Sequence, residues 1–275
     1  MKTAHVFFVV VGLVGLVTAQ ALPAPKDKEA PVALRAQILD GSGLGRFDTE
    51  TQPASGNAVT RLNELLIRLT AGSAVPRAGA LLRTARSSRG EVVLARGTTE
   101  QVELAQAVLV ELKRDELPRA RLQCTLLTLP VAAASAHGLK VNVVTATDVA
   151  AAGRLARDAI KHQGTLHNLP EATVAPLAPF TVASPGKAKG EGAVPIQVHG
   201  EMVPLAADQV GVGARLVRSA AGPNRPETTV GDAVFRLRAG ESAMVMTVEG
   251  TFAVVLVVRC VEIGRETPAA APTGR

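Results

Sequence analysis

The chain has 275 residues, of which 47% are hydrophobic and 2% aromatic, and it contains neither Trp nor Tyr. Proteins that bind single-stranded nucleic acid stack the bases on aromatic side chains, so this composition excludes such a platform. The formal net charge is +6, but the basic residues are scattered rather than gathered in a run of about five or six. We therefore expect no nucleic-acid partner.

The N-terminus has the layout of a secretory signal peptide over residues 1–21. A basic start is followed by an apolar run at residues 6–17, and Ala19-Gln20-Ala21 is a small-x-small cleavage site. The alternative is a membrane anchor, but the run is shorter than the roughly 20 residues that a spanning helix needs. We expect an exported protein of the periplasm or outer membrane, with membrane association only through assembly.

A small α/β domain is predicted over residues 32–118, after a Pro-rich, charged linker at residues 22–31. It begins with a strand at residues 32–39 and a loop at 40–57 rich in Gly, Ser and Asp. A helix is expected at residues 58–69, capped by Asn57 and stopped by Gly72. Its apolar residues recur with the helical period: Val59, Leu62, Leu65, Leu66 and Leu69.

The stretch GEVVLARGTTEQVELAQAVLVEL (90–112) predicts a second strand and a second helix. Residues 92–95 read as the strand, and Gly97 permits the turn. Thr98 and Gln101 have the spacing of a capping box, in which the hydroxyl and the amide each bind a backbone N–H of the first helical turn. Pro118 ends the pattern, so this part of the chain reads as β-α-β-α.

A mainly antiparallel β domain with one helix is predicted over residues 119–264, which makes the whole chain α+β. The segment from Arg121 alternates apolar and polar residues, as a strand does, and a helix at about 147–161 is capped by Thr147 or Asp148. Residues 265–275 are of low complexity and are expected to be disordered. Further strands are expected at 173–175, 180–183, 194–199, 210–217, 233–238, 242–248 and 252–263.

The two cysteines, Cys124 and Cys260, leave two alternatives open. An even pair in an exported protein is a possible disulfide. Each also sits inside an apolar, strand-like run, so the other interpretation is two buried thiols packed as small hydrophobic side chains.

Catalytic and metal-binding patterns are not found in the sequence. His162 and His167 are five residues apart and lack the helical spacing of a zinc-protease motif. We interpret these two, together with His137 and His199, as surface or loop residues. No Gly-x-Ser-x-Gly elbow occurs, and no pair of carboxylates stands out. We therefore expect no enzymatic activity, no cofactor and no metal.

Several segments taken in order resemble the secretins, a family of envelope proteins of bacterial secretion and pilus systems. LARGTTEQV (94–102) followed by RLQCTLLTL (121–129) is similar to the junction between a secretin N-domain and the secretin domain. The later similar segments are TLHNLPEATV (165–174), GVGARL (211–216), LRAGESAMVM (237–246) and the closing strand at 252–263. The residues that carry the motifs, as structural positions, are Gly97, Thr98, Gln101, Pro170, Gly211 and Gly240.

The resemblance implies a non-catalytic envelope component, with itself and other envelope or secretion-system proteins as partners. It spans residues 91–263 and departs from the family in its short, Gly-rich hairpin region, SPGKAKGEG (184–192). It therefore implies the fold better than it implies a membrane pore. The leading hypothesis is a reduced secretin that self-assembles or docks, and the alternative is a monomeric periplasmic binding or scaffolding protein of the same fold. A third alternative is an envelope hydrolase whose catalytic residues are far apart in the sequence.

Overall fold

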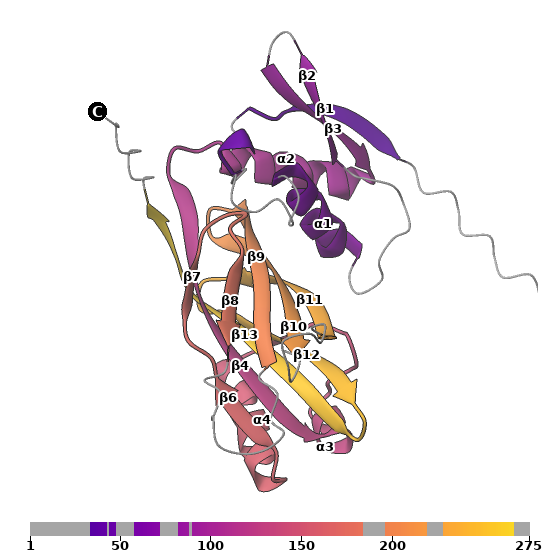
Figure 1. Cartoon of the computed structure of the whole chain (residues 1–275), viewed down its shortest axis with the longest axis vertical. Coiled ribbons are helices and arrows are strands. Elements are labelled where there is room, and N and C mark those ends of the chain that lie inside the picture. The colour runs from indigo at the N-terminus through magenta and orange to yellow at the C-terminus, as the bar shows by residue number, and fades with distance from the viewer. Residues whose placement is uncertain are drawn as a thin grey trace, which may run out of the picture. The chain divides into compact units, whose positions relative to one another are not determined.

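The computed structural model of the chain describes residues 34–42, 44–47, 58–71, 82–87, 90–183, 196–218 and 228–266 (Figure 1). Its elements are mostly antiparallel strands with a few helices, so the fold is α+β, as predicted. The predicted signal peptide, linker, Asn57 cap and Gly72 stop lie outside the described residues. The tail was predicted to begin at residue 265, but the last strand continues to Glu266. The rest of the predicted tail, from residue 267, also lies outside the described residues.

The N-terminal part is a three-stranded antiparallel sheet packed on two helices. The strand order is β1 (Arg35–Asp40), β3 (Gly90–Gly97) and β2 (Leu82–Ser87). The 3-10 turn η1 (Leu44–Phe47) and helix α1 (Ala58–Ala71) follow β1, and helix α2 (Thr99–Leu112) follows β3. The β-α-β-α prediction missed β2, because its sequence LRTARS contains a single strongly apolar residue and shows no alternation.

The capping box at the start of α2 is present and also connects the two helices. The Gln101 backbone N–H donates to Thr98 Oγ1 over 3.2 Å, and the Thr98 N–H donates to Gln101 Oε1 over 2.9 Å. The Gln101 amide nitrogen then donates to Thr70 Oγ1 of α1 over 3.0 Å. The cap therefore fixes both the start of α2 and its position against α1.

A four-stranded antiparallel sheet has the order β11-β10-β9-β8. Its strands are β8 (Phe180–Ala183), β9 (Ile196–Ala206), β10 (Gln209–Arg218) and β11 (Thr228–Arg238). One face joins the core of the N-terminal part, since Val203 and Leu205 of β9 belong to the same buried cluster as Leu62 and Leu66 of α1. That core continues past the predicted domain boundary at 118/119, and the division into two domains stays a prediction.

A six-stranded antiparallel sheet has the order β5-β12-β13-β4-β6, with the short β7 also paired to β4. Its long central strands are β4 (Leu117–Pro130) and β13 (Phe252–Glu266), which run side by side in Figure 1. The others are β5 (Thr145–Thr147), β6 (Thr165–Asn168), β7 (Ala172–Val174) and β12 (Ser242–Glu249). Both faces of β13 are buried, which explains its nearly continuous apolar sequence.

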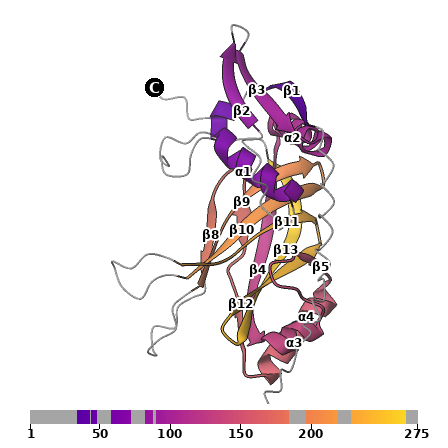
Figure 2. The ribbon, with the colours of Figure 1, turned by 90° about the vertical axis from the view of Figure 1, so that its right-hand side faces the viewer.

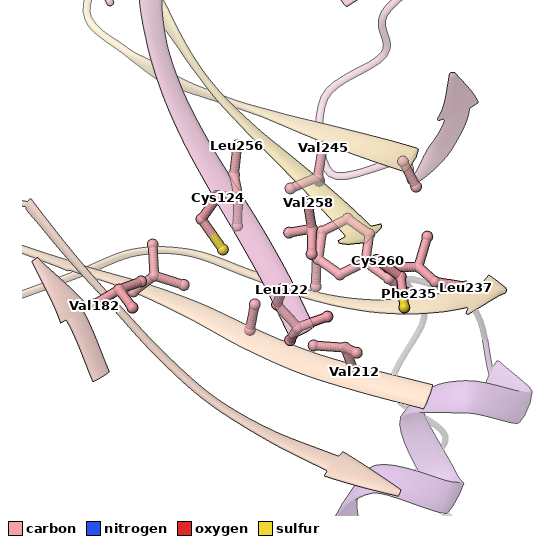
Figure 3. Close-up of a cluster of buried hydrophobic side chains, with 14 of the residues drawn as sticks. Leu122, Cys124, Val182, Val212, Phe235, Leu237, Val245, Leu256, Val258 and Cys260 are labelled. Atoms are coloured by element: carbon pink, nitrogen blue, oxygen red, sulfur yellow. The ribbon is translucent and has the colours of Figure 1, made fainter. Parts of the chain in front are cut away.

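Two helices, α3 (Val131–Ala136) and α4 (Val149–Lys161), cover one face of the six-stranded sheet (Figure 2). The prediction of one helix in this part was incomplete, because α3 has only six residues and its sequence VAAASA shows no polar face. The other face packs on the four-stranded sheet. Figure 3 shows Phe235 and Leu237 of β11 in that interface, with Leu122 of β4 and Val258 of β13.

Candidate functional site

The open edges of the four-stranded sheet form the candidate functional site. Within the described residues, β11 and β8 each have a neighbouring strand on one side only. An edge strand presents unpaired backbone N–H and C=O groups, which can pair with another chain unless the protein blunts them. The two edges belong to opposite ends of the same sheet.

The edge at β11 borders a groove of about 1100 Å³. One wall is β11 from Thr229 to Leu237, and the opposite wall is the segment 142–148, which contains β5. Since β5 is itself the end strand of the six-stranded sheet, the groove is flanked by the edges of two different sheets. Val143 and Val144 are exposed on its wall, so the groove offers apolar surface as well as strand edges.

Helix α1 is tied to β11 by two arginines. Arg68 forms an ion pair with Asp232 and donates to the Ala233 carbonyl over 3.0 Å. Burial lowers the pKa of Arg68, and the charge of Asp232 opposes that effect. From the strand, Arg236 donates to the Leu69 carbonyl over 2.9 Å, which satisfies a backbone group in the last turn of the helix.

The β11 edge is also irregular near its start. Gly231 pairs with Leu216 and Thr229 with Val217, so Val230 is an extra residue in the ladder, a β-bulge. Its carbonyl accepts a hydrogen bond from Thr247 Oγ1 over 2.9 Å. Bulges and side-chain contacts of this kind blunt an edge, so the carbonyls of Val230 and Ala233 are already engaged.

Two glycines in β10 let α1 approach the sheet. A Cβ at Gly211 would lie 2.8 Å from Leu69 Cδ1, and one at Gly213 would lie 2.5 Å from Leu65 Cδ2. Carbon atoms pack at about 3.5–4.0 Å, so a side chain at either position would have to displace the leucine side chains of α1. The close packing of α1 on the sheet therefore depends on the Gly-Val-Gly sequence of this strand.

The β8 edge is short, with four residues. Phe180 lies over Gly200 of β9, where an added Cβ would be 2.5 Å from its ring carbon Cζ. The shortness of β8 limits what can pair with it, and the glycine lets its aromatic ring lie flat against the neighbouring strand.

Comparison with known proteins gives matches among solved structures. The chain is similar to the secretin domain of InvG from the Salmonella SPI-1 injectisome, with 12% identity over 88% of this chain and 90% of that one, at a TM-score of 0.24. It is also similar to the type II secretion secretin XcpQ from Pseudomonas aeruginosa, with 7% identity, coverage of 88% and 77%, and a TM-score of 0.25. No family model and no curated protein matches. TM-scores of this size do not indicate a function.

The residues of the secretin-like motifs do not form one site. Gly97, Thr98 and Gln101 make the turn into α2, and Gly211 contacts α1. The other two lie in connections: Pro170 is exposed between β6 and β7, and Gly240 has a φ of +82° in the turn between β11 and β12.

Both cysteines are free, buried thiols in the structure. Cys124 is opposite Val258, and Cys260 is opposite Leu122, so the two are diagonal neighbours on one face of the sheet. Diagonal positions are about 7–8 Å apart, whereas a disulfide needs Cα atoms within about 7 Å. Figure 3 shows the two sulfurs apart among aliphatic side chains, an arrangement that fits the buried-thiol interpretation rather than the disulfide.

Burial also makes these thiols poor nucleophiles. It raises the pKa of Cys124 to about 12 and, with the charge of Glu241, that of Cys260 to about 11. Since the thiolate is the reactive form, neither is suited to covalent catalysis.

The remaining ionisable groups make local contacts. His137 Nε2 lies 2.8 Å from Asp158 Oδ2 and lowers the pKa of that carboxyl. Burial raises the pKa of Glu201, which Arg61 opposes from 3.9 Å. The part of the chain that the structure describes holds no group of three or more His, Cys, Asp or Glu residues able to bind a metal. None of its helices is long and apolar enough to cross a bilayer.

Most of the groove residues could not be recognised from the sequence. Arg68 and Asp232 are 164 positions apart, and each by itself looks like an ordinary surface charge. The wall segment VNVVTATD (141–148) does contain exposed valines next to a helix cap, which was the one local sign that this segment borders a surface.

Proposed function

We propose that the protein is a non-catalytic component of the cell envelope that assembles head to tail with copies of itself, within a protein secretion or pilus-type system. The observation that supports assembly is the sheet with one open edge at β11 and another at β8. Two different surfaces that meet between successive copies give a heterologous contact, which closes into a ring or extends as a filament. The secretin-like motifs supply the envelope and secretion setting.

A second function has its own supporting observation. Thr247 and Arg68 already bind the carbonyls of Val230 and Ala233 on β11, as expected if this edge is protected in a monomer. On that basis the alternative is a periplasmic binding or scaffolding protein with the same fold and no self-assembly.

Native mass separates the two functions. The full chain is expressed with its own N-terminus, extracted in mild detergent, and measured by native mass spectrometry and electron microscopy. Rings or filaments support assembly, and a monomer supports the scaffolding function. In the first case, the double variant Thr228→Lys/Thr229→Lys, which adds charge to exposed positions of the β11 edge, should dissociate the particles. Thr173→Lys on β7, also exposed, is the matched control and should leave them intact.

A further inference from the structure

A second, smaller cleft lies between helix α4 and the six-stranded sheet, away from the open edges of the four-stranded sheet. Its volume is about 250 Å³. The helix contributes Val149 and Ala156 to its wall, and the sheet contributes side chains from β4, β6, β12 and β13. Its lining is shared with the groove at β11 only at Ser242, and it plays no part in the assembly proposed above.

The floor of this cleft changes from apolar to polar along the strands. At one end Leu127 of β4 is paired with Leu166 of β6. In the middle Val257 is opposite Thr125. At the other end Arg259 lies between its two partners across the sheet, Ser242 and Gln123. A ligand that fills the cleft therefore meets hydrocarbon at one end and a guanidinium at the other.

Among the described residues, four arginines have a buried Nε atom that makes no hydrogen bond: Arg61, Arg121, Arg218 and Arg259. Arg259 differs from the other three. Three of these guanidinium groups have a carboxylate within 4.0 Å: Arg61 with Glu201, Arg121 with Glu262, and Arg218 with Glu249. For Arg259 the described residues provide no such carboxylate.

An unpaired charge that is partly buried is costly unless a partner of opposite sign satisfies it. A carboxylate suits a guanidinium best, because its two oxygens match the paired N–H donors. The lining of the cleft contains no Asp or Glu, so the cleft itself leaves the position at Arg259 open for a ligand.

We propose that this cleft binds a small aliphatic monocarboxylate, with its chain against Leu127, Leu166 and Val257 and its carboxylate on Arg259. A volume of about 250 Å³ corresponds to roughly eight non-hydrogen atoms at about 30 Å³ for each water-sized group. Hexanoate, which has eight, is therefore the probe.

The test is calorimetric titration of the full chain with sodium hexanoate. We expect saturable binding, and no binding of hexylamine or hexan-1-ol, which keep the chain but not the negative charge. Arg259→Gln should weaken hexanoate binding about tenfold or more, because it removes a hydrogen bond between charged groups. Arg154→Gln, which removes an exposed charge from α4 outside the cleft, should change it less than about twofold.

Absence of hexanoate binding to the wild-type chain would overturn the proposal, as would equal binding of hexylamine. An unchanged affinity in Arg259→Gln, or an equal loss in Arg154→Gln, would show that the guanidinium does not hold the carboxylate. Because the ligand series uses the unmodified protein, the outcome does not depend on how well a variant folds, and it is independent of the oligomeric state.

Discussion

Replacing Gly211 with alanine tests the packing of α1 on the four-stranded sheet. The new Cβ would lie 2.8 Å from Leu69 Cδ1 and 3.2 Å from Val203 Cγ2. Both neighbours are buried in the cluster that joins α1 to β9, so neither side chain can move into solvent. Overpacking of this kind costs about 1–3 kcal/mol. We expect that loss in the free energy of unfolding, measured by urea denaturation at one protein concentration.

Gly264→Ala is the matched control, since an added Cβ there has no atom within 4 Å and should change stability by less than about 0.5 kcal/mol. The cause can be isolated with Leu69→Ala, which removes the clashing methyl groups. The double variant should then be more stable than the sum of the single effects predicts, by about 1 kcal/mol or more. Strict additivity, or equal losses at positions 211 and 264, would refute the steric explanation.

Three further predictions concern the core and the surface charges. Neither Cys124 nor Cys260 should react with iodoacetamide at pH 8 in the folded chain, but both should react after unfolding without reductant; a mass that shows no alkylation would reveal a disulfide. Asp40 has its pKa lowered to about 2 by Lys113 and Ser42, so its stabilising contribution is present above about pH 3.8 and is lost as pH falls toward 2. The difference in urea midpoint between wild type and Asp40→Asn should therefore shrink over that range, and a constant difference would contradict the assigned cause. Phe235→Ala should cost about 3–5 kcal/mol in urea denaturation, because the ring is fully buried between the two sheets; a loss below about 1 kcal/mol would mean that the interface collapses around the gap.

The sequence predicted those elements in which one local signal dominates. The capping box located the start of α2. Of the two cap candidates for α4, Thr147 and Asp148, the structure has Asp148, which accepts from the Ala151 N–H over 2.5 Å. Strands β10 and β12, which are buried on both faces over most of their length, were found from their apolar content. In each case the residues that specify the element are adjacent in the chain, so no tertiary information is needed.

Other elements depend on contacts that the sequence does not display. The pairing of β5 with β12 involves three residues, and all four residues of β6 are exposed, so neither strand has an apolar pattern of its own. Strand β9 was predicted at 194–199, of which 194–195 lie outside the described residues, and it continues to Ala206. The residues after His199 face the helices of the N-terminal part on one side and the six-stranded sheet on the other.

The candidate site was the least predictable feature, because a sheet edge is defined by the order of strands and not by a motif. Gly211 was singled out from its similarity to a secretin strand, but its contact with Leu69 of α1 appears only in the folded chain. The register that sets Cys124 and Cys260 diagonally follows from the pairing of β4 with β13, which a count of cysteines cannot supply.

The two proposed functions differ in what happens at one short segment of β11. Thr247 and Arg68 bind the carbonyls of Val230 and Ala233, and a strand that adds to this edge would have to replace those contacts there. From Val234 to Arg238 the strand makes no comparable side-chain contact to its carbonyls within the described residues. Assembly through the second half of β11 would therefore leave the contact between Arg68 and the Ala233 carbonyl intact, whereas assembly along the whole strand would break it. If Arg68→Met increases self-association, the link protects the edge; if it leaves the native mass unchanged, the contact between copies lies beyond Ala233 or on another surface.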